Sequence, residues 1–595
     1  MGGATMMLGS KYRGENKVTK TTHFFVSFVC ISSFLVYYFL FSPLRAGYYE
    51  NQFSDGSGQY IQVIDFNKVS DFQLQPIPFS KNISRTDFNQ WLKDQERVSF
   101  ERMFDNICNE ESSGKFDNCF PGVVFASPSK SKPDYFYHWI RDGAITINTL
   151  INTYSEVDKE RTLKTVLNYV NASIDLQHRS NPSGPVDDPL LRNLGEPKYH
   201  VDNSPFEQVW GRPQNDGPPL RAIALLNFLN SMNVSSSSDA NSDYQWIFDD
   251  LITLDLKFVL YNWHVSSFDL WEEVDAYHFF TSMVQLKALV DGRAFILKKL
   301  SSGIALTSAE DDLLKDLEAG IDKVESFIKS SSSGFINHEK GYIVETPSNL
   351  DQRSGLDIAV IMASTLTHDS EDENDGYFTN YDQFSFLSAA PGPSSSSFTS
   401  ADKTDTPFLF DIDDPLILNH FNELVEKMAI LYPINHNRLG TNMGVAVGRY
   451  PEDIYDGIGI SEGNPWFIST LTSAELIFKL VHKMHITQEP LIIEPLKNKF
   501  WHKIFAFGNL QNTSVMIPYN SLAFNQTLYT IFKYGDSFLS KVNEHVSDQG
   551  HMSEQFNRYH GYNQGAENLT WSYGTFANAL RWRQIVDNLI HPTNI

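Results

Sequence analysis

Apolar residues at helical spacing recur along this chain from Arg85 almost to its end, and this recurrence limits the fold more than any other feature. One such helix should begin with Asn464 as its N-cap and Pro465 at its first helical position. About a dozen such segments, separated by long loops rich in Gly, Pro and Asn, predict an all-α domain with few strands. Another predicted helix follows a Thr307–Ser308 cap region, and its apolar face consists of Leu313, Leu317, Ile321, Val324 and Ile328.

The N-terminal region combines a basic tail with a long uncharged stretch. Lys and Arg predominate before Thr21, and no Asp, Glu, Lys or Arg occurs from Thr21 to Leu44. The run from Phe24 to Ser42 has about 19 residues, which is close to the length that a transmembrane helix needs. We therefore predict a cytosolic tail over residues 1–22 and a transmembrane signal-anchor over 23–42, with the remainder lumenal or extracellular. A cleaved signal peptide is the alternative, although no small-x-small site follows the apolar run.

The remainder of the chain divides at about residue 84. Residues 43–84 are polar with scattered aromatic side chains, and predict either a stem or an extended segment packed on the main domain. Residues 85–595 form the predicted main domain. Within it, 235–243 and 368–406 are rich in Ser, Asn, Asp, Gly or Pro, which is typical of surface insertions.

Glycosylation triplets and two cysteines fit a secretory protein. The triplet at Asn568 lies beside candidate site residues, so we expect it to be unused. Cys108 and Cys119 lie in one polar loop that could close as a disulfide, with two unpaired thiols as the alternative. The predicted N-glycan acceptors are Asn82, Asn171, Asn233, Asn512 and Asn525.

Charge and composition narrow the possible partners. The net charge of −25 argues against a nucleic-acid partner, because no basic surface is available to neutralise phosphates. No metal-binding, phosphate-binding or dinucleotide-binding motif occurs, so we expect no cofactor. Aromatic residues make up 13% of the chain, which favours an interior or cleft lined by rings. A monomer that binds a neutral substrate fits these properties.

The densest chemical signal is the stretch from Phe268 to Val274, Phe-Asp-Leu-Trp-Glu-Glu-Val, where three carboxylates accompany an indole. Hydrolysis of a glycosidic bond needs carboxyl groups for acid and base work, and sugar rings pack on flat aromatic faces. If the stretch is helical, Glu272 and Glu273 point about 100° apart, so a partner carboxyl must come from elsewhere. An exposed acidic helix start with Trp271 in the core is the alternative interpretation.

Four other segments also combine aromatic, acidic and amide side chains. Each has a local structural explanation when taken alone, such as a turn or a helix cap. In order, wording and spacing, the five segments together resemble the glucoamylases of glycoside hydrolase family 15, especially those of yeasts, over roughly Arg85 to the C terminus. The four segments are Pro133 to Asp142, Trp210 to Pro218, Gly448 to Tyr455 with Gly463 to Trp466, and Met552 to Gln555 with Asn568 to Tyr573.

The resemblance implies an (α/α)6 barrel with a pocket built from the loops at one end. It implies Glu272 as general acid and Glu554 as the general base that activates water, with Tyr135 bonded to the base or its water. The residues that it implies as substrate contacts or pocket lining are Trp139, Arg141, Asp142, Trp210, Leu270, Trp271, Glu273, Arg449, Tyr455, Trp466 and Trp571.

The implied activity is exo-acting, inverting hydrolysis of terminal α-1,4-linked glucose, and more slowly α-1,6-linked glucose, from starch, glycogen or dextrins. Inversion requires carboxyl groups about 6.5–9.5 Å apart, with Glu272 protonated and Glu554 ionised. We recognise no starch-binding module, so soluble glucans are expected to be better substrates than granules. The alternatives are a family relative that cleaves trehalose or dextran, and an inactive anchored glucan-binding protein.

Overall fold

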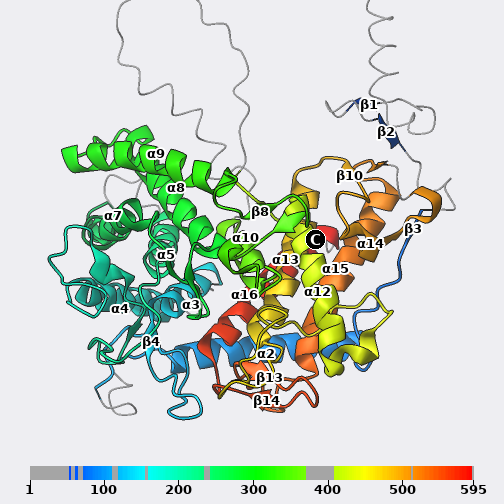
Figure 1. Ribbon diagram of the computed structural model, residues 1–595, viewed down its shortest axis with the longest axis horizontal. Coiled ribbons are helices and arrows are strands. Elements are labelled where there is room, and N and C mark those ends of the chain that lie inside the picture. Colours follow the sequence, from blue (N-terminus) through cyan, green and yellow to red (C-terminus); the bar gives the residue numbers. More distant parts are fainter. Residues whose placement is uncertain are drawn as a thin grey trace, which may run out of the picture.

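The computed structural model describes residues 53–54, 60–63, 72–109, 118–153, 159–232, 241–369, 408–510 and 514–591. Helices dominate these ranges (Figure 1). Most of both predicted insertions, and the predicted signal-anchor at 23–42, lie outside the described residues. Among the residues that are described, no helix combines the length and apolar character needed to cross a bilayer.

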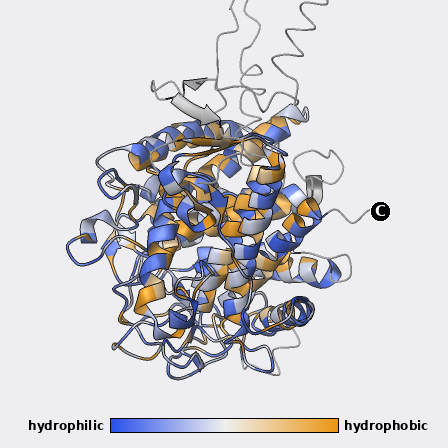
Figure 2. Ribbon diagram, turned by 90° about the vertical axis from the view of Figure 1, so that its right-hand side faces the viewer, coloured by the Kyte–Doolittle hydropathy of each residue, from blue (hydrophilic) through white to orange (hydrophobic). Residues whose placement is uncertain are grey.

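Six helices form a closed inner ring, in which each helix packs against the next and the last returns to the first. Most of their side chains are buried, including Leu225, Leu289 and Leu471, so these helices are surrounded by protein on nearly their whole circumference. In Figure 2, hydrophobic stretches are most frequent toward the middle of the molecule. In ring order they are α3 (Ile140–Asn152), α5 (Gly217–Ser231), α8 (Phe279–Ser301), α10 (Ile358–Thr367), α13 (Phe467–Ile486) and α16 (Thr570–Ile590).

Each inner helix is covered on its outside by one outer helical segment. The outer segments are amphipathic, because only one face meets the inner ring. Two concentric rings of six confirm the (α/α)6 barrel that the resemblance implied. The outer segments are α2 (Arg85–Asp105), α4 (Lys159–Gln177), α6 (Asn241–Ile247) joined by a π-helical turn at Phe248–Ile252 to α7 (Thr253–Asn262), α9 (Ser308–Lys329), α12 (Pro415–Leu431) and α15 (Leu522–Asn543).

One predicted helix start is confirmed and the other is wrong. Thr307 caps α9 by accepting a bond from the Glu310 N–H, and Glu310 reaches back in a full capping box. By contrast, α13 begins at Phe467, and Asn464 does not cap it. Asn464 instead donates to Gln555 Oε1 at 2.9 Å and accepts from the Arg558 N–H, so long-range contacts use the amide that local sequence assigned to the helix.

The alternation of inner and outer helices gives the barrel two different ends. Every inner helix is entered from a loop at one end, and every outer helix returns the chain to that same end. The loops that precede the inner helices are therefore neighbours, although they are spread over the whole chain. The loops that follow the inner helices lie at the opposite end.

Among the described residues, short strands occur only as two-stranded pairs and in one small sheet. The sheet has the order β1-β2-β12-β10 and consists of β1 (Phe53–Ser54), β2 (Tyr60–Val63), β12 (Val515–Ile517) and β10 (Leu491–Ile493). The two-stranded pairs are β3 (Gln73–Leu74) with β11 (Phe505–Ala506), β4 (His138–Trp139) with β5 (Lys198–Tyr199), β6 (Ser267–Phe268) with β7 (Asp275–Ala276), β8 (Ile336–Asn337) with β9 (Tyr342–Ile343), and β13 (Gln555–Phe556) with β14 (Asn563–Gln564). Short helical turns lie at Arg192–Gly195, Pro347–Asn349, Pro433–Arg438, Trp501–Ile504 and Gly508–Leu510.

The segment that leads into α2 packs on the main domain, which was one of the two alternatives for residues 43–84. Strand β3 pairs with β11, and β2 pairs in parallel with β12. Phe72 is buried and stacks on Phe505, with ring centroids 4.6 Å apart. No break in packing therefore separates residues 72–84 from the helical barrel.

The cysteines and the described glycosylation triplets have distinct surroundings. The structure joins Cys108 to Cys119 in a disulfide, with the Cα atoms 5.9 Å apart. Asn82, Asn171 and Asn525 are exposed, as a glycan acceptor must be, while Asn233 and Asn512 lie outside the described residues. The Asn568 side-chain oxygen accepts a hydrogen bond from the Tyr573 hydroxyl at 2.6 Å, which holds this side chain against α16.

Candidate active site

All five motifs meet at the end of the barrel where the inner helices begin. Trp139 precedes α3, Asp216 precedes α5, Asp357 caps α10, Trp466 precedes α13, and Trp571 lies in the first turn of α16. The stretch from Phe268 to Val274 lies in the loop that leads into α8. Converging helix N-termini favour negative charge, which suits a site built around carboxylates.

The stretch from Phe268 to Val274 is the turn of the β6–β7 hairpin rather than a helix. Asp269 holds this turn, because its Oδ1 accepts the N–H groups of Glu273 at 2.7 Å and Val274 at 2.8 Å. Glu272 adopts a φ of 66°, in the left-handed region that non-glycine residues rarely occupy. In this turn the side chains of Glu272 and Glu273 reach different partners. A helix would also have separated them, because adjacent helical residues point about 100° apart.

Glu272 accepts hydrogen bonds from two of the other loops. Its Oε1 accepts from Trp139 Nε1 at 2.6 Å and from Gln214 Nε2 at 2.9 Å. The Arg141 guanidinium lies 3.8 Å from the same oxygen, and is itself held by Gln214 and Asp216. Gln214 and Asp216 belong to the Trp210–Pro218 segment, but sequence reasoning gave neither a role.

Glu554 occupies a more enclosed position. Its side chain is fully buried, and its Oε2 lies 3.4 Å from the Tyr455 hydroxyl and 3.5 Å from Gln555 Nε2. Its Oε1 accepts no hydrogen bond from any described residue. Burial raises the pKa of Glu554 to about 8, although bonding to Tyr135 and the charge of Arg449 oppose the rise. This differs from the expectation that Glu554 stands ionised, and the physical reason is that too few donors reach a buried carboxyl.

Tyr135 connects the two carboxyl groups. Its hydroxyl is 3.0 Å from the Tyr455 hydroxyl, and its ring meets Trp139 edge-on at 5.5 Å. Burial raises the pKa of Tyr135 well above its ordinary value, and the charges of Glu554 and Glu272 both add to the rise. Through Tyr455 and Trp139, Tyr135 therefore links Glu554 and Glu272, which are 282 positions apart in the chain.

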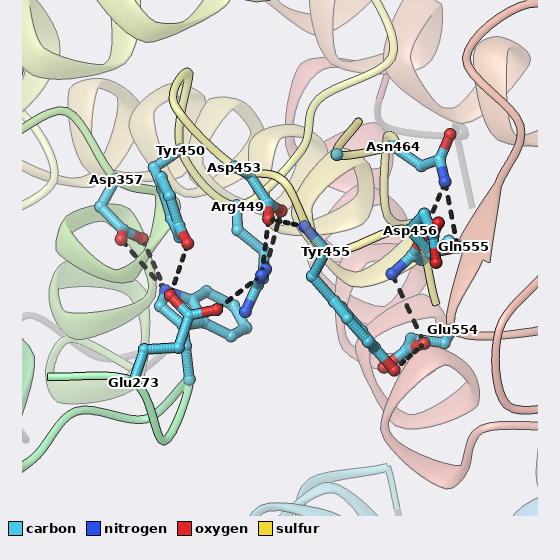
Figure 3. A network of polar contacts seen from close by, with 12 residues as sticks. Glu273, Asp357, Arg449, Tyr450, Asp453, Tyr455, Asp456, Asn464, Glu554 and Gln555 are labelled. Carbon is cyan, nitrogen blue, oxygen red and sulfur yellow. Dashed lines mark hydrogen bonds and ion pairs between the residues drawn. The ribbon is translucent and has the colours of Figure 1, made fainter. Parts of the chain in front are cut away.

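A network of ion pairs surrounds Glu273 beside the carboxyl pair (Figure 3). Arg449 pairs with Glu273 at 2.9 Å and binds Asp453 through two nitrogens, while Arg353 donates to Glu273 at 2.7 Å. Burial would raise the pKa of Glu273, but Arg449, the Tyr450 hydroxyl and Arg353 outweigh it and lower that pKa. Sequence reasoning named Glu273 and Arg449 and missed Arg353, which lies outside all five motifs.

Aromatic rings line the site around Arg449. Trp271 and Trp466 lie 5.7 Å apart, and the Arg449 guanidinium lies 5.2 Å from each ring. Tyr455 is the next ring, 6.2 Å from Trp466. On the Glu272 side, Trp210 lies 6.1 Å from Trp139. Trp271 donates to Asp357 at 3.0 Å, and Leu270 and Trp571 are buried at the same end.

The remaining predicted contact, Asp142, lies beside Arg141 at 3.7 Å. Burial raises the pKa of Asp142 to about 6, with Arg141 opposing the rise and Glu272 adding to it. Every residue of the predicted site thus lies at one end of the barrel. Paired carboxyls with aromatic walls and charged hydrogen-bonding groups can bind a sugar ring and exchange protons with a glycosidic bond.

Comparison with known proteins identifies the family of this chain. Residues 106–581 match the model described as "Glycosyl hydrolases family 15". The chain belongs to that family. It is 38% identical over 516 residues to the intracellular sporulation-specific glucoamylase of Saccharomyces cerevisiae, with 84% of each chain covered. It is 37% identical to a glucoamylase of Saccharomycopsis fibuligera, covering 85% of this chain and 92% of that one.

Solved structures of family 15 members agree with this assignment. A glucoamylase structure from Saccharomycopsis fibuligera superposes with a TM-score of 0.71 at 36% identity, covering 85% of this chain and 97% of that chain. The Hypocrea jecorina family 15 glucoamylase gives a TM-score of 0.68 at 25% identity, covering 85% and 75%. The family resemblance that the five motifs carried is therefore confirmed.

Proposed function

We propose that this family 15 member is an exo-acting, inverting glucan 1,4-α-glucosidase. It removes terminal α-1,4-linked glucose, and more slowly α-1,6-linked glucose, from the non-reducing ends of starch, glycogen or dextrins and releases β-D-glucose. The observation that carries the proposal is that Tyr135 contacts both Tyr455, which donates to Glu554, and Trp139, which donates to Glu272, at a ring-lined end of an (α/α)6 barrel. The names of its relatives support the same activity.

In the proposed reaction, Glu272 is the general acid. It gives its proton to the glycosidic oxygen as the bond to the anomeric carbon breaks, and the leaving sugar departs as an alcohol. The hydrogen bonds from Trp139 and Gln214 to one oxygen fix the orientation of this carboxyl. Arg141 and Asp142 would bind hydroxyl groups of the terminal glucose as donor and acceptor.

Glu554 is the proposed general base. A water bonded to Oε1 would attack the anomeric carbon from the face opposite the leaving group and pass its proton to the carboxylate, so the configuration inverts. That water would also supply a donor which the buried oxygen lacks among the described residues. Each hydrogen bond to a carboxylate lowers its pKa, so binding a water favours the ionised form that the base requires.

The decisive experiment is product analysis with the full-length chain. We expect maltooligosaccharides to yield glucose from the first turnover, with the β-anomer formed initially. Parallel assays on maltose, isomaltose and trehalose separate the proposed activity from a family relative with another bond preference. Absence of glucose release from all maltooligosaccharides would instead favour the inactive glucan-binding alternative.

The Glu272→Gln variant tests the acid assignment. We expect a loss of at least about 10³-fold in turnover, because the amide cannot donate a proton to the leaving oxygen. Oligosaccharide binding, measured by calorimetry, should persist, since the amide is similar in size and polarity. Retention of most of the rate would overturn the assignment of Glu272.

We also propose a single-pass type II arrangement, with residues 23–42 in a membrane and the barrel on the lumenal or extracellular side. The support is the charge pattern of the N-terminal region and the exposure of Asn82, Asn171 and Asn525. A mobility shift on glycosidase treatment, together with release from membranes only by detergent, is the expected result. Release by alkaline carbonate alone would contradict the anchor.

A further inference from the structure

Lys198 lies beside the site in a cage of aromatic rings, and no motif included it. It is the residue of β5 that faces Trp139 across the β4–β5 pair. Only 2% of the residue is exposed. Its Nζ lies 3.4 Å from the centroid of the Trp210 ring, 4.2 Å from Tyr137, 4.2 Å from Phe206 and 4.6 Å from Trp139. None of the described carboxylates forms an ion pair with it.

A buried ammonium without a paired carboxylate needs another source of stabilisation. Faces of aromatic rings supply part of it, and four of them converge here. Burial lowers the pKa of Lys198 to about 8, and the charge of Glu272 is the largest influence that opposes this, followed by Asp134. Arg212 repels the ammonium from the other side. Lys198 therefore stays largely protonated below neutral pH, with Glu272 as the main negative charge that it senses.

The cage also connects Lys198 to Glu272 through Trp139. The ammonium lies over the Trp139 ring, whose Nε1 donates to Glu272 at 2.6 Å. A cation on the face of an indole withdraws electron density and makes the ring N–H a stronger donor. Both the direct field and this stronger bond favour the ionised form of Glu272.

The other charges that face Glu272 are mixed. Arg141 lies 3.8 Å away and acts in the same direction as Lys198, but its guanidinium is shared with Asp216 and lies beside Asp142. Asp142 and the Tyr135 hydroxyl also interact with Glu272. Because Asp142 and Asp216 offset Arg141, the ammonium of Lys198 is an added positive charge whose removal is not compensated locally.

We propose that Lys198 is a positioning residue that sets the pH at which Glu272 releases its proton and holds Trp139 and Trp210 in place around it. The proposal rests on the function proposed above for Glu272. A general acid works best when its proton is released near the operating pH. The caged ammonium would supply a positive charge on the Trp139 side of that carboxyl.

The test compares the pH dependence of kcat/KM in three variants of the full-length chain between pH 4 and 7.5, on maltotriose. Lys198→Met keeps a flexible apolar stem that packs against rings but removes the charge. We expect the high-pH limb of its kcat/KM profile to move to higher pH by about 0.5–1 unit, because ionised Glu272 is less favoured without the positive charge. Lys198→Arg, which keeps the charge, should show less than half of that shift.

Lys541→Met is the matched control. Lys541 is also a buried lysine, but it lies in the last turn of α15, and its ammonium is paired with Glu544 at 2.8 Å instead of lying over Trp139. This variant should lose stability without moving the limb. Equal shifts in Lys198→Met and Lys541→Met, or no shift in Lys198→Met, would overturn the proposal.

A readout independent of turnover separates this proposal from the proposed function. Trp139 bonds directly to Glu272, so the difference in tryptophan fluorescence between wild type and Glu272→Gln follows the ionisation of Glu272 as pH changes. Its midpoint should rise in the Lys198→Met background by the same amount as the high-pH limb. A chain that releases no glucose but shows this shift would contradict the proposed function and support the role of Lys198, whereas an unchanged midpoint would refute that role.

Discussion

At the scale of single residues, the site depends on a backbone conformation that glutamate rarely adopts. Glu272 has a φ of 66° because the β6–β7 turn is held by Asp269, whose carboxylate receives two successive N–H groups. Such a conformation costs on the order of 1 kcal/mol and persists only where the surroundings impose it. Asp269 thus supports the turn without contacting the reacting groups, which agrees with its absence from the predicted substrate contacts.

A second residue, Asp357, predicts how stability depends on pH. Burial raises the pKa of Asp357 to about 8, although the Ala359 N–H and Trp271 donate to it. The folded protein therefore binds a proton that the unfolded chain releases near pH 4. This contribution is fully present below about pH 4 and is lost as pH rises toward about 8.

The Asp357→Asn variant keeps an acceptor for Trp271 and cannot ionise. We expect its Tm to decline between pH 5 and 8 by about 2 °C less than the wild-type Tm. Thermal unfolding followed by circular dichroism measures the difference. Asp250→Asn, at an exposed position, is the control and should parallel the wild type; a parallel decline in Asp357→Asn would contradict the assignment.

At the scale of elements, the start of α9 gives a clean test of capping. Thr307→Ala removes the side-chain acceptor of the capping box and should cost about 1 kcal/mol of the free energy of unfolding. Glucose release should stay unchanged, because α9 lies in the outer ring. Thr307→Ser, which keeps the hydroxyl, should restore most of the loss in denaturant titration; failure to do so would point to the lost methyl group instead.

The starts of α9 and α13 show which features of the fold could be predicted from the sequence. The apolar face of α9 and its cap are set by residues close together in the chain, so local pattern was sufficient. The start of α13 is set by contacts of Asn464 with Gln555 and Arg558, about 90 positions away, which no local pattern contains. Lys198 and Arg353 were missed for the same reason, because only the folded loops bring them to Glu272 and Glu273.

At the scale of the whole molecule, resemblance to a family gave the barrel and the two carboxyls, while helix counting alone gave only an all-α domain. The small sheet and the packing of residues 72–84 could not be predicted, because β2 and β3 pair with strands more than 400 positions later in the chain. Short strands of two to four residues carry little periodicity to detect.

Phe72→Ala tests whether that N-terminal packing stabilises the barrel. Removing a fully buried ring that stacks on Phe505 should cost about 3 kcal/mol or more in the free energy of unfolding. The kcat should not change, because the contact is remote from the inner-helix N-termini. Phe72→Leu should lose much less, and an equal loss in activity and stability for Phe72→Ala would mean that the segment also shapes the site.

The position of the β2–β12 pair has a consequence for how the molecule would be oriented when tethered. Strand β12 lies between the end of α13 and the start of α15, on the end of the barrel opposite the loops that carry Glu272 and Glu554. Figure 1 shows β1 and β2 beside β10, far from the β13–β14 pair that follows Glu554. If the chain is anchored as proposed above, the loops that carry Glu272 and Glu554 would face away from the point of attachment. The chain ends of large branched glucans would then reach those loops without entering the space between the protein and its anchor.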